Sequence, residues 1–168
     1  NEKVLQARLA DAAFFWQEDQ ATPLAQNAPR LAAVVFHEKL GTLAEKVERV
    51  KTLAAFIADA LGYDPLEKAD TLRAVELMKC DLVSKAVFEF TELQGTMGKY
   101  YALASGEKPV VAQAIEEHYM PRFAGDQLPQ TKPGIAAAIA DKLDSLTGFF
   151  ALDMQPTGSQ DPYALRRQ

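Results

Sequence analysis

GTLAEKVERVKTLAAFIADALG, residues 41–62, carries the spacing of an amphipathic α-helix. Its apolar side chains recur at steps of three or four residues, which places them on one helical face: Leu43, Val47, Val50, Ala54, Ile57 and Leu61. Thr42 and Glu45 match a capping box, in which each side chain binds a backbone N–H at the start of a helix. Gly62 suits the end, because glycine adopts the left-handed conformation at low cost. The stretch therefore predicts one helix with a defined start and end.

The following residues predict a second helix. Asp64 is a candidate N-cap, Pro65 fits the first helical position, and Glu67 completes the start signature. We expect this helix to run without interruption through PLEKADTLRAVELMKCDLVSKAVFEF, residues 65–90, so that Cys80 lies inside it. A break is expected at Thr91, which with Gln94 matches another capping box.

The same reasoning predicts helices along most of the chain. Four expected helices cover residues 4–19, 91–106, 109–121 and 135–152, and a last one begins at Asp161 and Pro162. Gly95 and Gly98 weaken the second of these, and we expect close approach of another helix as the compensation. Residues 34–36 favour a short extended segment. The predicted fold class is all-α, a bundle of about seven to nine helices.

Composition favours a single soluble globular domain over residues 1–168, with a possible linker helix within residues 1–27. One cysteine cannot form an internal disulfide, which favours the reducing cytoplasm. No stretch approaches the roughly 18 apolar residues of a membrane span. The start lacks a methionine and the end stops just after a helix begins, so we expect a piece of a longer protein. A net charge of −5 argues against a domain that binds nucleic acid alone.

The cysteine raises the question of chemistry. Cys80 is followed by Asp81, and the pair could be a nucleophile, part of a metal site, or a packed side chain beside an acid. A reactive thiolate needs a helix N-terminus or a neighbouring cation, and zinc needs several cysteines or histidines close together. Cys80 is expected deep inside a helix, where the adjacent Lys79 points to another face, and no second cysteine or histidine is near, so we favour a buried, inert Cys80.

The remaining candidates are two histidines and two acids. His37 and His118 do not form an H-E-x-x-H motif, and we predict structural or capping roles for them. Asp141 and Asp144 are three residues apart on one predicted helical face. Their carboxylates could hold Mg²⁺, or Lys142 and solvent could satisfy them on a polar stripe. The chain has no glycine-rich phosphate-binding motif of the known spacings.

Five blocks in order carry a family resemblance: VVFHEKLGTLAEKVERV, LMKCDLVSKAVFEFTELQGTMGKYYA, EEHYMPRFAGDQLP, IADKLDSLTGFFAL and PTGSQDPYALRR. Together they resemble the beta subunit of bacterial glycyl-tRNA synthetase over nearly the whole chain. The resemblance implies an internal segment of a cytoplasmic heterotetramer of two alpha and two beta chains. It implies the alpha subunit and tRNA(Gly) as partners. Glycine, ATP and Mg²⁺ would then be used by the alpha subunit.

The resemblance further implies an HD-like domain, the all-helical fold of metal-dependent phosphohydrolases. Its motifs fall here on Arg49, Thr52, Cys80, Asp81 and Asp141, so that threonine and cysteine stand where histidine ligands belong. Two carboxylates without imidazoles would hold Mg²⁺ weakly and activate water poorly. We therefore expect no active site, no metal and no cofactor in this chain. Asp81 is expected to survive as a hydrogen-bonding anchor towards Arg49.

Three roles remain open at this point. The first is a non-catalytic HD-like module that supports tRNA(Gly) binding, with candidate contacts chosen because they are basic and in or near loops: Arg122, Lys132, Arg166 and Arg167. The second is a residual phosphohydrolase using Asp81 and Asp141. The third is a subunit-interaction scaffold without RNA contact, which the acidic net charge favours.

Overall fold

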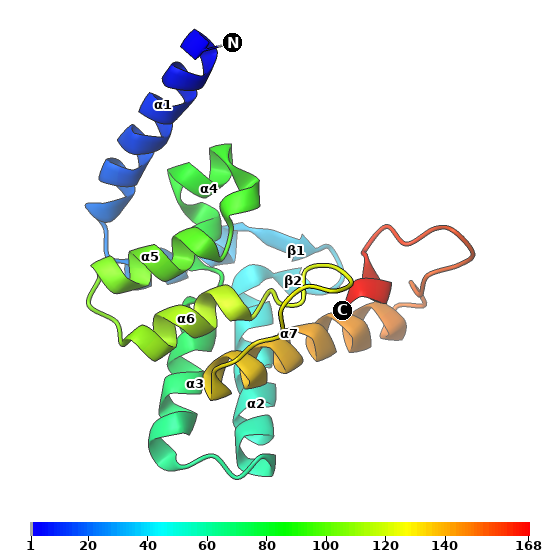
Figure 1. Cartoon of the computed structure of the whole chain (residues 1–168). Coiled ribbons are helices and arrows are strands. Elements are labelled where there is room, and N and C mark those ends of the chain that lie inside the picture. The colour runs from blue at the N-terminus through cyan, green and yellow to red at the C-terminus, as the bar shows by residue number, and fades with distance from the viewer. Residues whose placement is uncertain (1) are drawn as a thin grey trace.

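The computed structural model describes residues 2–168, apart from the side chain of Arg167. Over that span it contains seven α-helices, four short 3-10 helices and one two-stranded sheet (Figure 1). The predicted all-α class is confirmed, whereas the HD-like topology stays a prediction. Among the described helices, none combines the length and the apolarity needed to cross a membrane.

Two helices form the base of the molecule, and both begin where the sequence predicts. α2 (Leu43–Ala60) starts at a complete Thr42–Glu45 capping box, and Gly62 follows its end with a φ of 69°. α3 (Pro65–Leu77) starts at a capping box between Asp64 and Glu67. The two helices pack against each other, and both pack against α7 (Lys132–Ala151).

The chain before α2 covers one end of this base. α1 (Glu2–Gln20) leads into the 3-10 helix η1 (Leu24–Ala33), whose Leu24 and Leu31 are buried in the core. The predicted extended segment is confirmed as β1 (Val35–His37), which pairs with β2 (Gly41–Thr42) in an antiparallel hairpin.

The expected single helix over residues 65–90 is wrong. α3 ends at Leu77, a 3-10 turn η2 (Cys80–Val83) follows, and a new helix α4 (Lys85–Glu89) begins. One local and one long-range contact explain why a new helix begins at Lys85. The Ser84 hydroxyl accepts from Val87 N and caps α4, and the Asp19 carboxylate of α1 accepts from Lys85 N and Ala86 N, both at 2.9 Å.

The capping box expected at Thr91 is also absent from the structure. Thr91 opens only the 3-10 turn η3 (Thr91–Leu93), without a side-chain cap. The next α-helix, α5 (Thr96–Ala104), is capped instead by a residue distant in sequence, since Asp81 Oδ2 accepts from Gly95 N at 2.6 Å and Gly98 N at 3.1 Å. A tertiary contact therefore replaces the predicted local one.

α5 packs against α6 (Pro109–Glu117), and α6 packs against α7. A Cβ at Gly98 would lie 2.7 Å from Ile115 Cγ2 of α6, so the expected reason for this glycine, close approach of another helix, is confirmed. The end of the chain forms less helix than predicted. The Asp161 carboxylate accepts from Leu165 N and Arg166 N, and only the 3-10 turn η4 (Leu165–Arg167) follows.

The core lies between α2, α3, α6 and α7, and is made of small and branched side chains such as Val50, Ala54, Ala74, Val75, Ala112, Ile115, Ala137 and Ala140. α1 stands apart, and Figure 1 shows its N-terminal part projecting from the body. Near the end of α1, Trp16 stacks on Tyr101 at 5.3 Å and the Tyr101 hydroxyl donates to Asp19 at 2.8 Å. Closer to its start, the Arg8 guanidinium lies over the Phe90 ring at 5.3 Å. The linker assignment of residues 1–27 stays a prediction.

Candidate functional site

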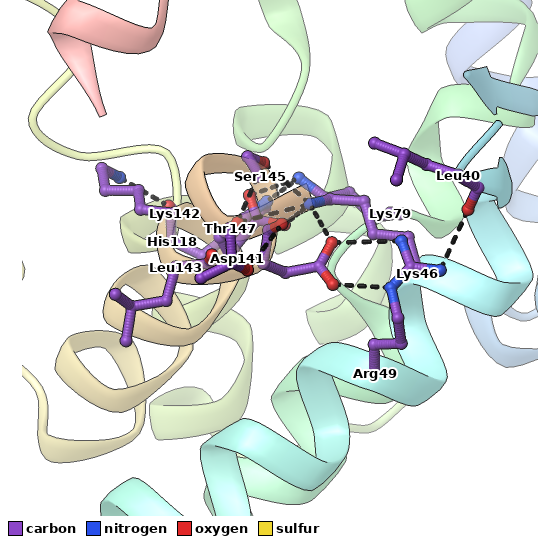
Figure 2. A network of polar contacts seen from close by, with 11 residues as sticks. Leu40, Lys46, Arg49, Lys79, His118, Asp141, Lys142, Leu143, Ser145 and Thr147 are labelled. Carbon is purple, nitrogen blue, oxygen red and sulfur yellow. Dashed lines mark hydrogen bonds and ion pairs between the residues drawn. The ribbon is translucent and has the colours of Figure 1, made fainter. Parts of the chain in front are cut away.

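One face of α7 carries polar side chains into the protein interior. Asp141, Asp144 and Ser145 are all buried and face α2 and the turn that follows α3. Their spacing of one, three and four residues puts them on one helical face. The alternative that solvent and Lys142 satisfy the two aspartates is wrong, since Figure 2 shows Lys46, Arg49 and Lys79 converging on this part of α7.

Asp144 is held by two cations of α2. Arg49 donates from Nε to Oδ1 at 2.6 Å and from Nη2 to Oδ2 at 3.2 Å, while Lys46 Nζ donates to Oδ2 at 3.0 Å. Arg49 also binds the Leu40 carbonyl at 3.0 Å. Lys46 is only 2% exposed and donates in addition to Ser145 Oγ at 2.9 Å. Arg49 therefore pairs with the buried carboxylate of Asp144 and not with Asp81.

Asp141 lies between two ammonium groups. Lys79 Nζ donates to Oδ2 at 3.0 Å, and Lys46 Nζ forms an ion pair with Oδ1 at 3.2 Å, although the geometry at Oδ1 does not make a hydrogen bond. Burial alone would raise the pKa of Asp141, but Lys79 and Lys46 outweigh burial and hold this pKa below its usual range. Asp141 is therefore an anion already paired with lysines.

His118 completes the cluster. Its Nδ1 lies 2.5 Å from the Ile115 carbonyl, which can only accept, so Nδ1 carries the proton and Nε2 accepts from Lys79 Nζ at 2.9 Å. Burial and the nearby Lys79 lower the pKa of His118 well below its usual value, so the ring is neutral. Burial also lowers the pKa of Lys79, against the pull of Asp141. The structural role predicted for His118 fits this position.

The Cys80–Asp81 pair lies beside the cluster without joining it. Cys80 is buried, its Sγ lies 3.5 Å from the Glu76 carbonyl, and burial with Asp81 raises the pKa of the thiol to about 12. Asp81 turns away to cap α5, so the expected anchor exists but does not reach Arg49. Burial raises the pKa of Asp81 to about 6, although the amides of Gly95 and Gly98 oppose the shift.

The five positions matched to HD motifs do not fit a divalent metal. Thr52 is exposed on α2, where its hydroxyl donates to the Glu48 carbonyl of its own helix. Cys80 and Asp81 are bonded elsewhere, and Asp141 holds two ammonium groups. Within residues 2–168, no group of three or more His, Cys, Asp or Glu side chains is arranged to hold a metal ion. The ammonium groups of Lys46 and Lys79 occupy the positions beside the Asp141 carboxylate.

The basic residues proposed for RNA contact are scattered. Lys132 lies at the start of α7, where it pairs with Glu67 and lies over the ring of Tyr63. Arg166 lies beyond the other end of α7 and donates to the Gly158 carbonyl at 2.7 Å. Arg122 is exposed, and its guanidinium has no hydrogen bond or ion pair with the other described residues. The side chain of Arg167 lies outside what the structure describes.

Sequence reasoning missed Lys46 and Lys79. The signal for Lys46 was present, because this residue falls between Leu43, Val47 and Val50 on the apolar face of α2. A lysine at such a position must reach a buried partner. Lys79 gave no such signal, since it lies in an irregular turn. His37, by contrast, has the local role predicted for it: its Nδ1 accepts from Lys39 N at 3.2 Å.

Comparisons with known proteins agree with the resemblance seen in the sequence. The family described as "Glycyl-tRNA synthetase beta subunit" matches residues 1–168. The chain is 60% identical over 168 residues to the "Glycine--tRNA ligase beta subunit" of Clostridioides difficile, and 56% identical over 168 residues to that of Desulforudis audaxviator. It is 54% identical over 167 residues to that of Neisseria gonorrhoeae. These alignments cover 99–100% of this chain and 24% of each relative, so the chain spans about a quarter of their length.

Proposed function

Because this chain belongs to the glycyl-tRNA synthetase beta-subunit family, we propose that it is a non-catalytic helical module of a glycine–tRNA ligase. In this proposal it supports tRNA(Gly) binding and performs no reaction of its own. Its partners are the ligase alpha subunit and tRNA(Gly), within a cytoplasmic heterotetramer. Glycine and ATP with Mg²⁺ are handled by the alpha subunit.

The self-contained buried cluster carries the non-catalytic part of the proposal. Asp141 and Asp144 each bind cations of the chain itself, and Asp81 binds backbone amides of α5. A phosphohydrolase needs carboxylates and imidazoles directed at a shared metal ion. Here the carboxylates are directed at lysine, arginine and N–H groups. The cluster therefore supports a structural role that joins α2, α6 and α7.

A metal-loaded preparation tests this point. We expect no hydrolysis of nucleotide phosphates above background in the presence of Mg²⁺ or Mn²⁺. Turnover that is lost on Asp141→Asn, in a variant whose circular dichroism is unchanged, would establish the residual phosphohydrolase instead.

Arg122 supports the RNA-binding part. It is the one residue of the proposed set whose described side chain lacks a hydrogen-bonding or ionic partner within residues 2–168, which leaves its donors available for a phosphate. Lys132 and Arg166 are weaker candidates because each already has a partner. Arg167 stays a prediction without a structural argument.

Charge reversal in the assembled ligase tests RNA contact. We expect Arg122→Glu to raise the KM for tRNA(Gly) about three- to tenfold, to remove tRNA protection near this loop, and to lower the salt slope of binding by about one. Lys39→Glu is the matched control, since Lys39 is exposed and forms no ion pair with any described residue. Unchanged protection and KM in Arg122→Glu would remove the RNA role.

A scaffold role is the second candidate, and α1 favours it. This helix has no buried residue, and it exposes Val4, Leu5, Leu9 and Phe14. Apolar side chains exposed along one helix are typical of a surface that packs against another domain or subunit. If the charge reversals leave tRNA binding intact, while Leu5→Lys with Leu9→Lys weakens assembly of the ligase, the scaffold reading replaces the first.

A further inference from the structure

A pocket opens directly onto the buried cluster. It has a volume of about 420 Å³ and lies between α7, the segment that follows α6, and the η3 region. Its inner wall includes Lys46, Lys79 and Asp141, and its outer wall includes Arg122 and Lys142. This volume falls within the roughly 300–1,000 Å³ typical of small-molecule sites.

The charge of the lining differs from that of the chain. Four lining side chains are cationic, Lys46, Lys79, Arg122 and Lys142, and two are carboxylates, Asp141 and Glu92. The chain as a whole carries a net charge of −5. An excess of cations in a concave, partly buried wall concentrates a positive potential there, because the low-dielectric surroundings screen it less than water does.

The cluster behind the wall leaves this excess unchanged. Asp141 and Asp144 are paired with three cations, Lys46, Arg49 and Lys79, and the adjoining His118 ring is neutral. Arg49 and Asp144 do not line the pocket, and their charges cancel in the ion pair between them, so the positive excess of the lining remains.

Two donors at the outer wall are available to a ligand. Lys142 Nζ donates to the carbonyls of His118 at 3.3 Å and Met120 at 3.0 Å, which fixes the ammonium group and leaves its third N–H unused. The Arg122 guanidinium, two residues further along the same segment, has no bonded partner among the described side chains. Asp126 is a carboxylate of the same loop that interacts electrostatically with Arg122. Its oxygens accept hydrogen bonds from the backbone amides of Arg122 and Gln127.

We propose that this pocket binds a phosphate group, carried either by a nucleotide or by an RNA strand. Arg122 donates in the planar, paired manner in which guanidinium binds phosphate oxygens, and Lys142 donates its third N–H. Lys46 and Lys79 supply the positive field at the back of the pocket. The proposal concerns binding only and stands independently of the tRNA role, since a free nucleotide would satisfy it.

Titrations at low ionic strength, about 50 mM salt, would test the pocket. Backbone amide chemical shifts of the 168-residue chain are followed by nuclear magnetic resonance with four probes: inorganic phosphate, adenosine 5′-monophosphate, adenosine, and a short RNA with no terminal phosphate. We expect shifts centred on residues 118–122 and 141–145 with the monophosphate, and none with adenosine. Shifts with the RNA identify a strand phosphate as a ligand, whereas shifts with the monophosphate alone identify a nucleotide or a terminal phosphate.

Neutral substitutions supply the second test. Arg122→Gln and Lys142→Gln are each expected to weaken monophosphate binding about tenfold or more, as loss of a charged hydrogen bond does. Lys39→Gln removes the same charge from an exposed position elsewhere and is expected to change binding less than twofold. Arg122 is exposed, so its substitution leaves the fold intact.

The proposal is overturned if adenosine binds as tightly as its monophosphate, if no phosphate probe shifts these residues, or if Arg122→Gln binds as the control does. A different result would show that the proposed tRNA role fails while the phosphate site holds. In that case Arg122→Glu leaves the KM for tRNA(Gly) unchanged in the assembled ligase, while Arg122→Gln still weakens binding of the monophosphate to the chain.

Discussion

Replacing Asp144 with alanine should strongly destabilise the protein. Asp144 is 6% exposed and accepts three hydrogen bonds, two from Arg49 and one from Lys46. Arg49 is 41% exposed and can be solvated by water in the variant, so the loss of its ion pair with Asp144 contributes little to the cost. Lys46 is 2% exposed and would keep only Asp141 as an ionic partner. Removing one partner of a buried ion pair costs about 3–5 kcal/mol.

Urea unfolding followed by far-ultraviolet circular dichroism measures this cost. A loss of about 3–5 kcal/mol corresponds to a fall in Tm of about 6–20 °C for a chain of this size. Glu38→Ala is the control, because Glu38 is an exposed carboxylate without an ion pair among the described residues, and its loss should change stability little. Lys46→Met should cost less than Asp144→Ala, since it leaves Asp144 with Arg49 and Asp141 with Lys79. A loss below about 1 kcal/mol for Asp144→Ala, the value of an exposed pair, would refute the buried-cluster reasoning.

Three further changes test other parts of the structure. The pKa of Asp81 is raised to about 6, so the folded state binds a proton that the unfolded state has released between about pH 4 and 6. As the pH rises from about 4 to 6, the wild type should therefore lose up to about 3 kcal/mol of unfolding free energy relative to Asp81→Asn. Equal pH slopes of the two proteins in urea unfolding would contradict the raised pKa. Gly98→Ala should cost about 1–3 kcal/mol because its Cβ would lie 2.7 Å from Ile115 Cγ2, whereas Gly148→Ala meets only the flexible end of a leucine and should cost less; equal losses by thermal unfolding would remove the packing argument. Cys80 is buried and the pKa of its thiol is raised to about 12, so iodoacetamide should label it in urea and leave it unlabelled in the folded state by mass spectrometry, and fast native labelling would place it at the surface.

Local signals predicted most of the helices but not where one of them breaks. The caps at Thr42 and Asp64 depend on residues three apart, and the structure has both. The interruption after Leu77 depends on Asp19 and Ser84, and Asp19 lies 66 residues before the amide of Lys85 that it binds. A helical pattern carries no information on contacts at that separation, which explains why residues 65–90 read as one helix.

In the candidate site, too, residues with local signals were predicted and partners distant in sequence were not. Asp141 and Asp144 were found because their spacing is local, while their partners on α2 lie 95–98 residues away along the chain. The apolar face of α2 did mark Lys46 as a lysine among core positions, and that mismatch between residue type and period was the available sign of a buried pair. Nothing local marked Lys79 as a member of the cluster, because it lies in a turn between helices whose direction is set by the fold.

Lysines of the chain itself hold the buried carboxylates of α7. A divalent cation bound by carboxylates and imidazoles ties several helices to one point. Here Lys46 of α2 and Lys79 after α3 perform that task, since they join Asp141 and Asp144 of α7 to the His118 ring that follows α6. The same connection fixes the His118 and Met120 carbonyls that hold Lys142. The cluster thereby helps to set the position of the cationic pocket wall.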